Sequence, residues 1–293
     1  MISKILQISP HFELRYEQID TPFGLHERVI KQAIGRSSSL ACLLKREYEQ
    51  LLALESRSPL RFNQAIGYVP NRLLLTYING ESFHQSLKKS QTWTFQQKLK
   101  LSIDLTQQID LLHHLGFVHL DLSPSNLICD QQNLLWLIDW MSAIDLRKTS
   151  AELLAFAKIK YSHPQDWPIF IQQRNQANLQ IHKQSLDLEL RQRLIKRDRF
   201  ALYCILYEIW LDQPLFLISQ AQLFEYQKLS FFKDTQAIDQ FQRWGESCLS
   251  AVHTIAMSDK IRKILNQIKL SLIEGEEMRE LVLFFERVHN QDQ

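Results

Sequence analysis

The chain has 293 residues, of which 45% are hydrophobic and 23% are charged, and its formal net charge is +2. This length suffices for one large domain or for two lobes that each have their own core. The near balance of charge argues against a protein that binds nucleic acid through attraction to phosphates. Only seven residues are glycine, and the sequence lacks both the G-x-G-x-x-G fingerprint of dinucleotide-binding folds and the Walker phosphate-binding loop.

The cysteines and the N-terminus indicate the compartment. The four cysteines (Cys42, Cys129, Cys204 and Cys248) are far apart and form no C-x-x-C pair, so a zinc ribbon or a redox motif is not expected. Sparse cysteine suits a reducing cytosol. The first ten residues lack the apolar region of a signal peptide, and no apolar run reaches the roughly 18 residues of a membrane span. We therefore expect a cytoplasmic protein without a membrane span.

The first quarter of the chain is predicted to form mostly strands. Turn residues separate predicted strands at residues 2–8, 12–19, 25–34, 64–69 and 72–78. Between the third and fourth of these, from Ser38, leucines recur every three to four positions, which predicts a helix that ends before Pro59.

The rest of the chain is predicted to be mainly helical. A helix covers residues 94–115, and Gly116 occupies the position of a C-cap glycine. Two short strands follow at 127–129 and 134–138, and the most apolar helix covers 198–211. We therefore predict an α+β fold with two lobes: a small antiparallel-sheet lobe (residues 1–78) and a larger helical lobe (residues 79–293).

The most informative stretch is 118–128. Asp121 and Asn126 lie five residues apart with Pro124 between them, and Asp139 follows at the end of an apolar strand. Two carboxylates and an amide at strand ends can hold a divalent cation on oxygen ligands. A carboxylate that does not bind the metal can accept a hydroxyl proton, and this division of roles is what phosphoryl transfer requires.

These residues resemble the eukaryotic-like (Hanks-type) protein kinase superfamily, and the chain is identified as a divergent member. The resemblance runs in order from about Val29 to Phe216. The matching pieces are Arg28–Lys31 for V-A-I-K, Glu47 for its ion-pair partner, 112–119 for the lead into the catalytic loop, His119–Asn126 for H-R-D-L-x-x-x-N, Ile138–Trp140 for D-F-G, Tyr161–Gln165 for the segment ending in A-P-E, and Asp198–Glu208 for the buried helix after it.

The resemblance implies ATP and Mg²⁺ as cofactors and a role for each matched residue. Asp121 positions the acceptor hydroxyl and takes its proton, and Asn126 and Asp139 hold Mg²⁺. The implied nucleotide contacts are Lys31 (oriented by Glu47) on the phosphates, Leu75 as a gatekeeper-like residue, and the backbone of Thr76 and Ile78 at the adenine. His119, Trp140 and Leu51 are expected to stack as a hydrophobic spine that Asp198 anchors.

The sequence departs from the family pattern at several positions. No glycine-rich loop precedes Lys31, so we expect the turn at 8–12 to contact phosphate through side chains such as Ser9 and His11; residues 21–24 are an alternative position for that loop. Ser123 replaces a lysine that is common in serine/threonine kinases, and the connection at about 166–197 is longer than usual.

Three functions remain open from these residues. The full motif set favours a protein serine/threonine kinase with a protein substrate. Ser123 and the altered segment around Gln165 fit a small-molecule or glycan phosphotransferase of the aminoglycoside or choline type. The glycine-free loop fits a pseudokinase scaffold, although the retention of Asp121 and both metal ligands argues against that function. The sequence predicts neither the substrate's identity nor an oligomeric state.

Overall fold

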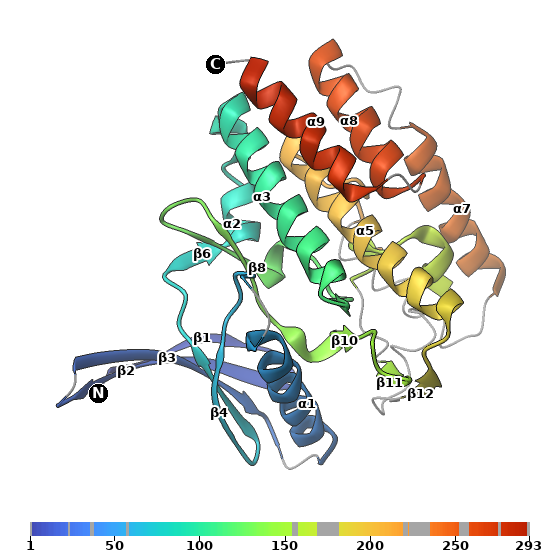
Figure 1. Ribbon diagram of the computed structural model, residues 1–293. Coiled ribbons are helices and arrows are strands. Elements are labelled where there is room, and N and C mark those ends of the chain that lie inside the picture. Colours follow the sequence, from blue (N-terminus) through green and yellow to red (C-terminus); the bar gives the residue numbers. More distant parts are fainter. Residues whose placement is uncertain are drawn as a thin grey trace.

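The structure is a computed structural model that describes residues 2–22, 24–35, 38–56, 59–153, 158–168, 182–218, 222, 235–251, 258–274 and 277–291. An antiparallel sheet with one helix beside it lies at one end of the molecule, and a group of long helices lies at the other (Figure 1). The predicted α+β, protein-kinase-like fold is confirmed. The division at residues 78/79 stays a prediction.

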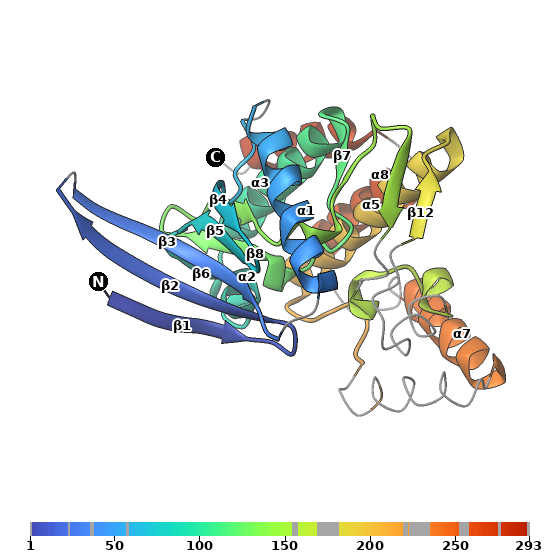
Figure 2. The ribbon, with the colours of Figure 1, turned by 90° about the horizontal axis from the view of Figure 1, so that it is seen from below.

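The N-terminal sheet has the strand order β1-β2-β3-β5-β4, and all its neighbours are antiparallel. Strands β2 and β3 pair without interruption from Phe12 opposite Ala33 to Thr21 opposite Gly24, and this long hairpin projects beyond the rest of the molecule (Figure 2). The predicted strands are confirmed within a few residues. The bounds are β1 (Ile2–Ile8), β2 (Phe12–Thr21), β3 (Gly24–Ala33), β4 (Ala65–Val69) and β5 (Arg72–Thr76).

Helix α1 (Ser38–Glu55) packs on the sheet with the face that the leucine spacing predicts. Its core leucines are almost completely buried, and Glu47, on the same face, has no exposed surface. A buried carboxylate is costly without a partner, so the position of Glu47 among leucines indicates a charge partner within the fold. The leucines concerned are Leu40, Leu43, Leu44, Leu51 and Leu54.

Gly80 begins the connection into the second part of the protein. It opens strand β6 (Gly80–Ser82), where its backbone approaches the carbonyl of Cys129 so closely that a Cβ atom would collide with it. Helix α3 (Phe95–His114) ends two residues before Gly116, which has a φ of +80° and donates its N–H to the carbonyl of His113. A left-handed conformation at a helix end favours glycine.

The helices of the second part pack side by side around a large core (Figure 1). Helix α5 contacts both α3 and α8, and α9 contacts α3 and α8. The predicted apolar helix begins earlier than expected, at Leu188 instead of Asp198, because Asp187 caps it by accepting a hydrogen bond from the N–H of Leu190. The helices are α2 (Phe83–Leu87), α5 (Leu188–Leu211), α7 (Thr235–Ala251), α8 (Asp259–Leu272) and α9 (Met278–Gln291).

Short strands support the loops between these helices. Strands β7 and β10 form one pair, β11 and β12 another, and β6-β8-β9 a small sheet. In the long connection at 166–197, residues 169–181 lie outside the described residues, and 182–197 form β12 and the start of α5. The bounds are β7 (Phe117–Val118), β8 (Leu127–Asp130), β9 (Leu135–Leu137), β10 (Ile144–Asp145), β11 (Ser150–Leu153) and β12 (His182–Ser185).

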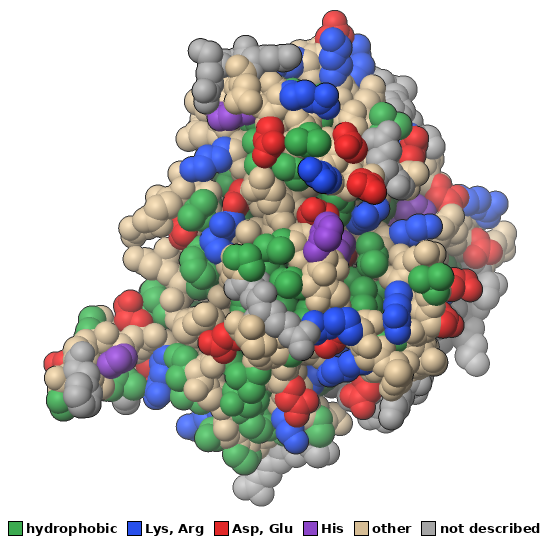
Figure 3. All heavy atoms as spheres, in the orientation of Figure 1, with side chains coloured by type: hydrophobic (Ala, Val, Ile, Leu, Met, Phe, Trp, Pro, Cys, Tyr) green, Lys and Arg blue, Asp and Glu red, His purple; other side chains and the backbone are tan. Residues whose placement is uncertain are grey.

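The surface carries charges of both signs. On the face shown in Figure 3, acidic and basic side chains are interspersed. Of the helices that the structure describes, none combines the length and the apolar character that crossing a membrane requires.

Candidate active site

The loop at residues 119–126 follows strand β7, and its backbone is hydrogen-bonded to a side chain of helix α5. The carboxylate of Asp198, which is 1% exposed, accepts hydrogen bonds from the backbone N–H of His119 (2.6 Å) and of Leu120 (2.7 Å). Leu120 has a φ of +64°, a left-handed conformation that is unfavourable for a leucine. The two charge-assisted hydrogen bonds stabilise this strained turn, and the prediction that Asp198 is a buried, hydrogen-bonded anchor is confirmed.

Asp198→Asn is expected to lower the free energy of unfolding by about 1–3 kcal/mol, because the amide offers one acceptor oxygen where two N–H groups need one each. Urea denaturation measures the change. Asp187→Asn is the matched control, since it lies at the N-cap of the same helix, where asparagine is as good as aspartate. Equal losses in the two variants would contradict the anchoring role.

Asp121 and Asn126 face each other across this loop. The Nδ2 of Asn126 donates to the backbone oxygen and to the Oδ2 of Asp121, both at 2.7 Å. The short 3₁₀ turn Pro124–Asn126 makes the distance possible, because it brings the chain back over Asp121. Burial raises the pKa of the Asp121 carboxyl, although the charge of Lys158 opposes this effect. Within the described ranges, Asn126 is the only residue that donates a hydrogen bond to the Asp121 carboxylate, and it does so to Oδ2.

Lys31, Glu47 and Asp139 form a three-membered ion cluster. The Nζ of Lys31 lies 2.7 Å from Glu47 Oε2 and 2.8 Å from Asp139 Oδ1. Lys31 and Glu47 are buried, whereas the side chain of Asp139 is 32% exposed. Burial alone would raise the pKa of Asp139, but the ammonium of Lys31 outweighs it and holds that pKa below its usual range. The cluster joins β3, α1 and the turn after β9.

A row of buried rings, in tilted and edge-on contact, connects this cluster with the loop. The His119 and Trp140 rings lie 4.9 Å apart, and the Phe62 ring lies 5.6 Å from Trp140. The backbone N–H of Trp140 donates to Glu47 Oε1 (3.1 Å). Leu51 and Trp140 belong to the same buried core, so the predicted grouping of His119, Trp140 and Leu51 has a geometric counterpart.

The five other residues predicted to contact nucleotide lie on β5, just beyond it, and in the turn before β2. Leu75 is 4% exposed, and Ile78 is 8% exposed. The N–H of Thr76 donates to the carbonyl of Gln64, so this N–H is already used within the sheet. The hydroxyl of Ser9 closes its own turn by bonding to the backbone of Phe12, and His11 is exposed. Their contact with nucleotide stays a prediction.

The turn that holds Ser9 and His11 does lie beside the ion cluster. The ring of Phe12, the residue that ends this turn, is 5.3 Å from Lys31 Nζ. The N–H of Ile34 donates to the carbonyl of His11, which fixes the turn over the end of β3. No glycine is needed for this geometry.

Sequence reasoning missed one residue of the site, Lys158. Its Nζ donates to Ser123 Oγ (2.6 Å), to Ser125 Oγ (2.5 Å) and to Asn126 Oδ1 (3.3 Å). Lys158 lies more than thirty residues after the loop, and no motif includes it. No local pattern could therefore have indicated this contact.

Asn126 and Asp139 fit a magnesium ion by the chemistry of their donor atoms. Among the described residues, no three His, Cys, Asp or Glu side chains form a metal cluster. Magnesium does not need such a cluster, because it binds to one or two protein carboxylates and takes its other ligands from phosphates and water. The carboxylate of Asp139, which is 32% exposed, and the amide oxygen of Asn126, which accepts from Lys158 at 3.3 Å in this structure, are oxygen donors of this kind.

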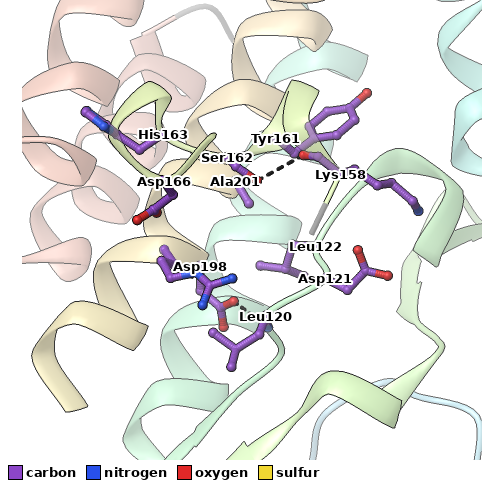
Figure 4. A pocket seen from close by; sticks show the side chains of 11 residues that line it. Leu120, Asp121, Leu122, Lys158, Tyr161, Ser162, His163, Asp166, Asp198 and Ala201 are labelled. Carbon is purple, nitrogen blue, oxygen red and sulfur yellow. Dashed lines mark hydrogen bonds between the residues drawn. The ribbon is translucent and has the colours of Figure 1, made fainter. Parts of the chain in front are cut away.

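A small pocket opens next to Asp121 (Figure 4). Asp121 and Lys158 point to the same side of it. The segment that begins at Lys158 also lines the pocket. In this segment the hydroxyl of Tyr161 donates to Glu208 Oε2 (2.9 Å), which connects the segment matched to A-P-E with the buried helix after it. The lining residues are Leu120, Asp121, Leu122, Lys158, Tyr161, Ser162, His163, Asp166, Arg197, Asp198 and Ala201.

The sheet with its helix, the helical second part and these side chains define a protein-kinase-like protein. In comparison with known families, the family model of the RIO domain matches residues 5–157, just over half of the chain. The chain therefore belongs to the RIO domain family, an atypical protein-kinase-like family of ATP-dependent phosphotransferases. The predicted membership in the kinase superfamily is confirmed. No curated protein matches the sequence.

Proposed function

We propose that this protein is a serine/threonine protein kinase that transfers the γ-phosphate of ATP to a protein hydroxyl. The observation that carries the proposal is the grouping of Asp121 and Asn126 with the cluster of Lys31, Glu47 and Asp139. Family membership supports ATP-dependent phosphate transfer. The Tyr161–Glu208 contact supports a protein substrate, because small-molecule phosphotransferases generally lack both segments that it joins.

In this proposal each residue has one task. Lys31, held by Glu47, binds the α- and β-phosphates of ATP, and Asp121 accepts the proton of the attacking hydroxyl. Asn126 and Asp139 would hold Mg²⁺, which supplies neutralisation of phosphate charge when bound. The raised pKa of Asp121 makes its carboxylate a stronger base than an exposed aspartate.

One observation favours a second candidate, a small-molecule phosphotransferase. Asp166 and Arg197, the two ends of the long connection at 166–197, line the pocket beside Asp121. Side chains of both charge signs next to Asp121 suit the recognition of a small polar acceptor.

Incubation with γ-labelled ATP, Mg²⁺ and a fractionated protein extract tests the proposal. We expect label in phosphoserine and phosphothreonine of proteins, and loss of transfer in Asp139→Asn. A thermal-shift measurement with ATP and Mg²⁺ accompanies it, since a ligand at about 100 times its Kd stabilises the folded state by about 2.7 kcal/mol. Label found only on metabolites would select the small-molecule candidate. If the protein shows neither a thermal shift with ATP nor phosphate transfer, the result favours the pseudokinase scaffold.

We also propose a cytoplasmic location. All four cysteines are free thiols, which fits a reducing compartment.

A further inference from the structure

The loop around Asp121 has no cation of its own for the phosphate that it would handle. Residues 119–126 contain no lysine or arginine, and His119 is buried with its Nε2 at the carbonyl of Ile138 (3.1 Å). Lys31 is already shared between Glu47 and Asp139. Catalysis of phosphoryl transfer depends almost entirely on positioning and on positive charge around the transferred group, so a protein cation beside Asp121 would add to the charge that Mg²⁺ and Lys31 supply.

Lys158 brings a cation to this place. Its three acceptors, Ser123, Ser125 and Asn126, all follow Asp121 in the loop, and Ser123 is fully buried. The ammonium is close enough to oppose the rise that burial causes in the pKa of Asp121, and to add to the effect of Lys31 in lowering the pKa of Asp139. It therefore lies within the same group of side chains as the proposed base and the proposed metal ligands.

The hydrogen-bond partners of Lys158 do not neutralise its positive charge. Two are neutral hydroxyls and the third is an amide oxygen; among the described residues, no carboxylate forms an ion pair with Lys158. Lys31, in contrast, is matched by two carboxylates. A positive charge that is held in place but not neutralised suits an anionic ligand.

We propose that Lys158 binds the γ-phosphate of ATP beside Asp121 and stabilises the charge on the phosphoryl group during transfer. In the step, the bond from the γ-phosphorus to the bridging oxygen of ADP breaks, the bond to the acceptor oxygen forms, and the hydroxyl proton goes to Asp121. Lys158 keeps its protons throughout. This inference rests on the proposed function and adds a residue from outside the loop to the site.

The test compares Lys158→Met with Lys158→Arg and with the control Lys160→Met. Lys160 lies two residues further along the same segment, and the described residues show no hydrogen bond from it to the loop. Two kinds of measurement are made with Mg²⁺ present: calorimetry gives the Kd values for ATP and for ADP, and turnover of γ-labelled ATP gives kcat and KM.

We expect Lys158→Met to lower kcat by about 10²-fold or more, as removal of one charge-stabilising donor does. It should weaken ATP binding by about tenfold while ADP binding stays within about twofold, because only ATP carries the γ-phosphate. Lys158→Arg should recover part of both losses, and Lys160→Met should match wild type.

Two results would overturn the inference while leaving the proposed function intact. The first is a wild-type protein that turns over ATP and a Lys158→Met variant with the same kcat and Kd values. The second is an equal loss of ATP and ADP binding in both Lys158 variants together with a lower Tm, which identifies a structural tether. If wild type binds neither nucleotide, the proposed function fails and the inference fails with it.

Discussion

In the Asp121→Asn variant, we expect kcat for phosphate transfer to fall by about 10²–10⁴-fold, the usual contribution of a general base. Asparagine has the same shape as aspartate and still offers an oxygen to Asn126 Nδ2, so the loop geometry is retained. What is lost is the group that accepts the hydroxyl proton. The Kd for ATP should stay within about threefold of wild type, because an interaction made only in the transition state does not affect substrate binding.

Asp110→Asn on α3 provides the control for this measurement. Asp110 lies near His114 at the end of the helix, and its side chain is 25% exposed. We expect its kcat to equal that of wild type. Wild-type turnover in Asp121→Asn would show that Asp121 is not the base.

The second large effect is expected in Lys31→Met, where the free energy of unfolding should fall by about 3–5 kcal/mol. Glu47 has no exposed surface, and removal of its partner leaves a buried charge without compensation. Burial raises the pKa of Glu47, so in the variant this carboxyl takes up a proton on folding. A raised pKa in the folded state gives stability that is present at low pH and lost as pH rises, so the deficit should be larger at pH 8 than at pH 5.

Two further variants make this result interpretable. Lys45→Met changes an exposed lysine of α1 and should alter the free energy of unfolding by less than about 0.5 kcal/mol. The double variant Lys31→Met/Glu47→Gln removes both charges and keeps the hydrogen bond from Trp140, so it should recover more than half of the loss. Chemical denaturation at both pH values measures all of these. If the free energy of unfolding of Lys31→Met lies within about 1 kcal/mol of the wild-type value, the ion-cluster argument is contradicted.

Local patterns predicted most of the fold. The leucine spacing in α1 predicted which face of the helix is buried. It also predicted that Glu47 lies on this face, because Glu47 falls at the same helical spacing as the leucines. Gly116 was predictable as a cap, since a left-handed helix end favours glycine. The start of α5 was missed because seven of its first eleven residues are polar or charged, and the cap at Asp187 outweighed that composition.

The candidate site was predictable where it follows from motif order, and not where it depends on contacts between distant segments. Asp121, Asn126 and Asp139 lie within twenty residues, and their order indicated their grouping. The contact of Lys158 with Ser123 depends on the path of the chain after β11, which no periodicity encodes. The engagement of the Ser9 hydroxyl in its own turn was likewise invisible in the sequence.

The anchoring of the loop by Asp198 has a consequence for truncated forms of this protein. Residues 5–157 identify the family, yet Asp198 and Lys158 both lie beyond them. A fragment that ended at residue 157 would leave the N–H groups of His119 and Leu120 without their acceptor and would expose the face of α3 that packs on α5. We therefore expect a fragment that ends at residue 157 to be less stable than the full chain, and its loop at 119–126 to lose the backbone conformation that Asp198 holds.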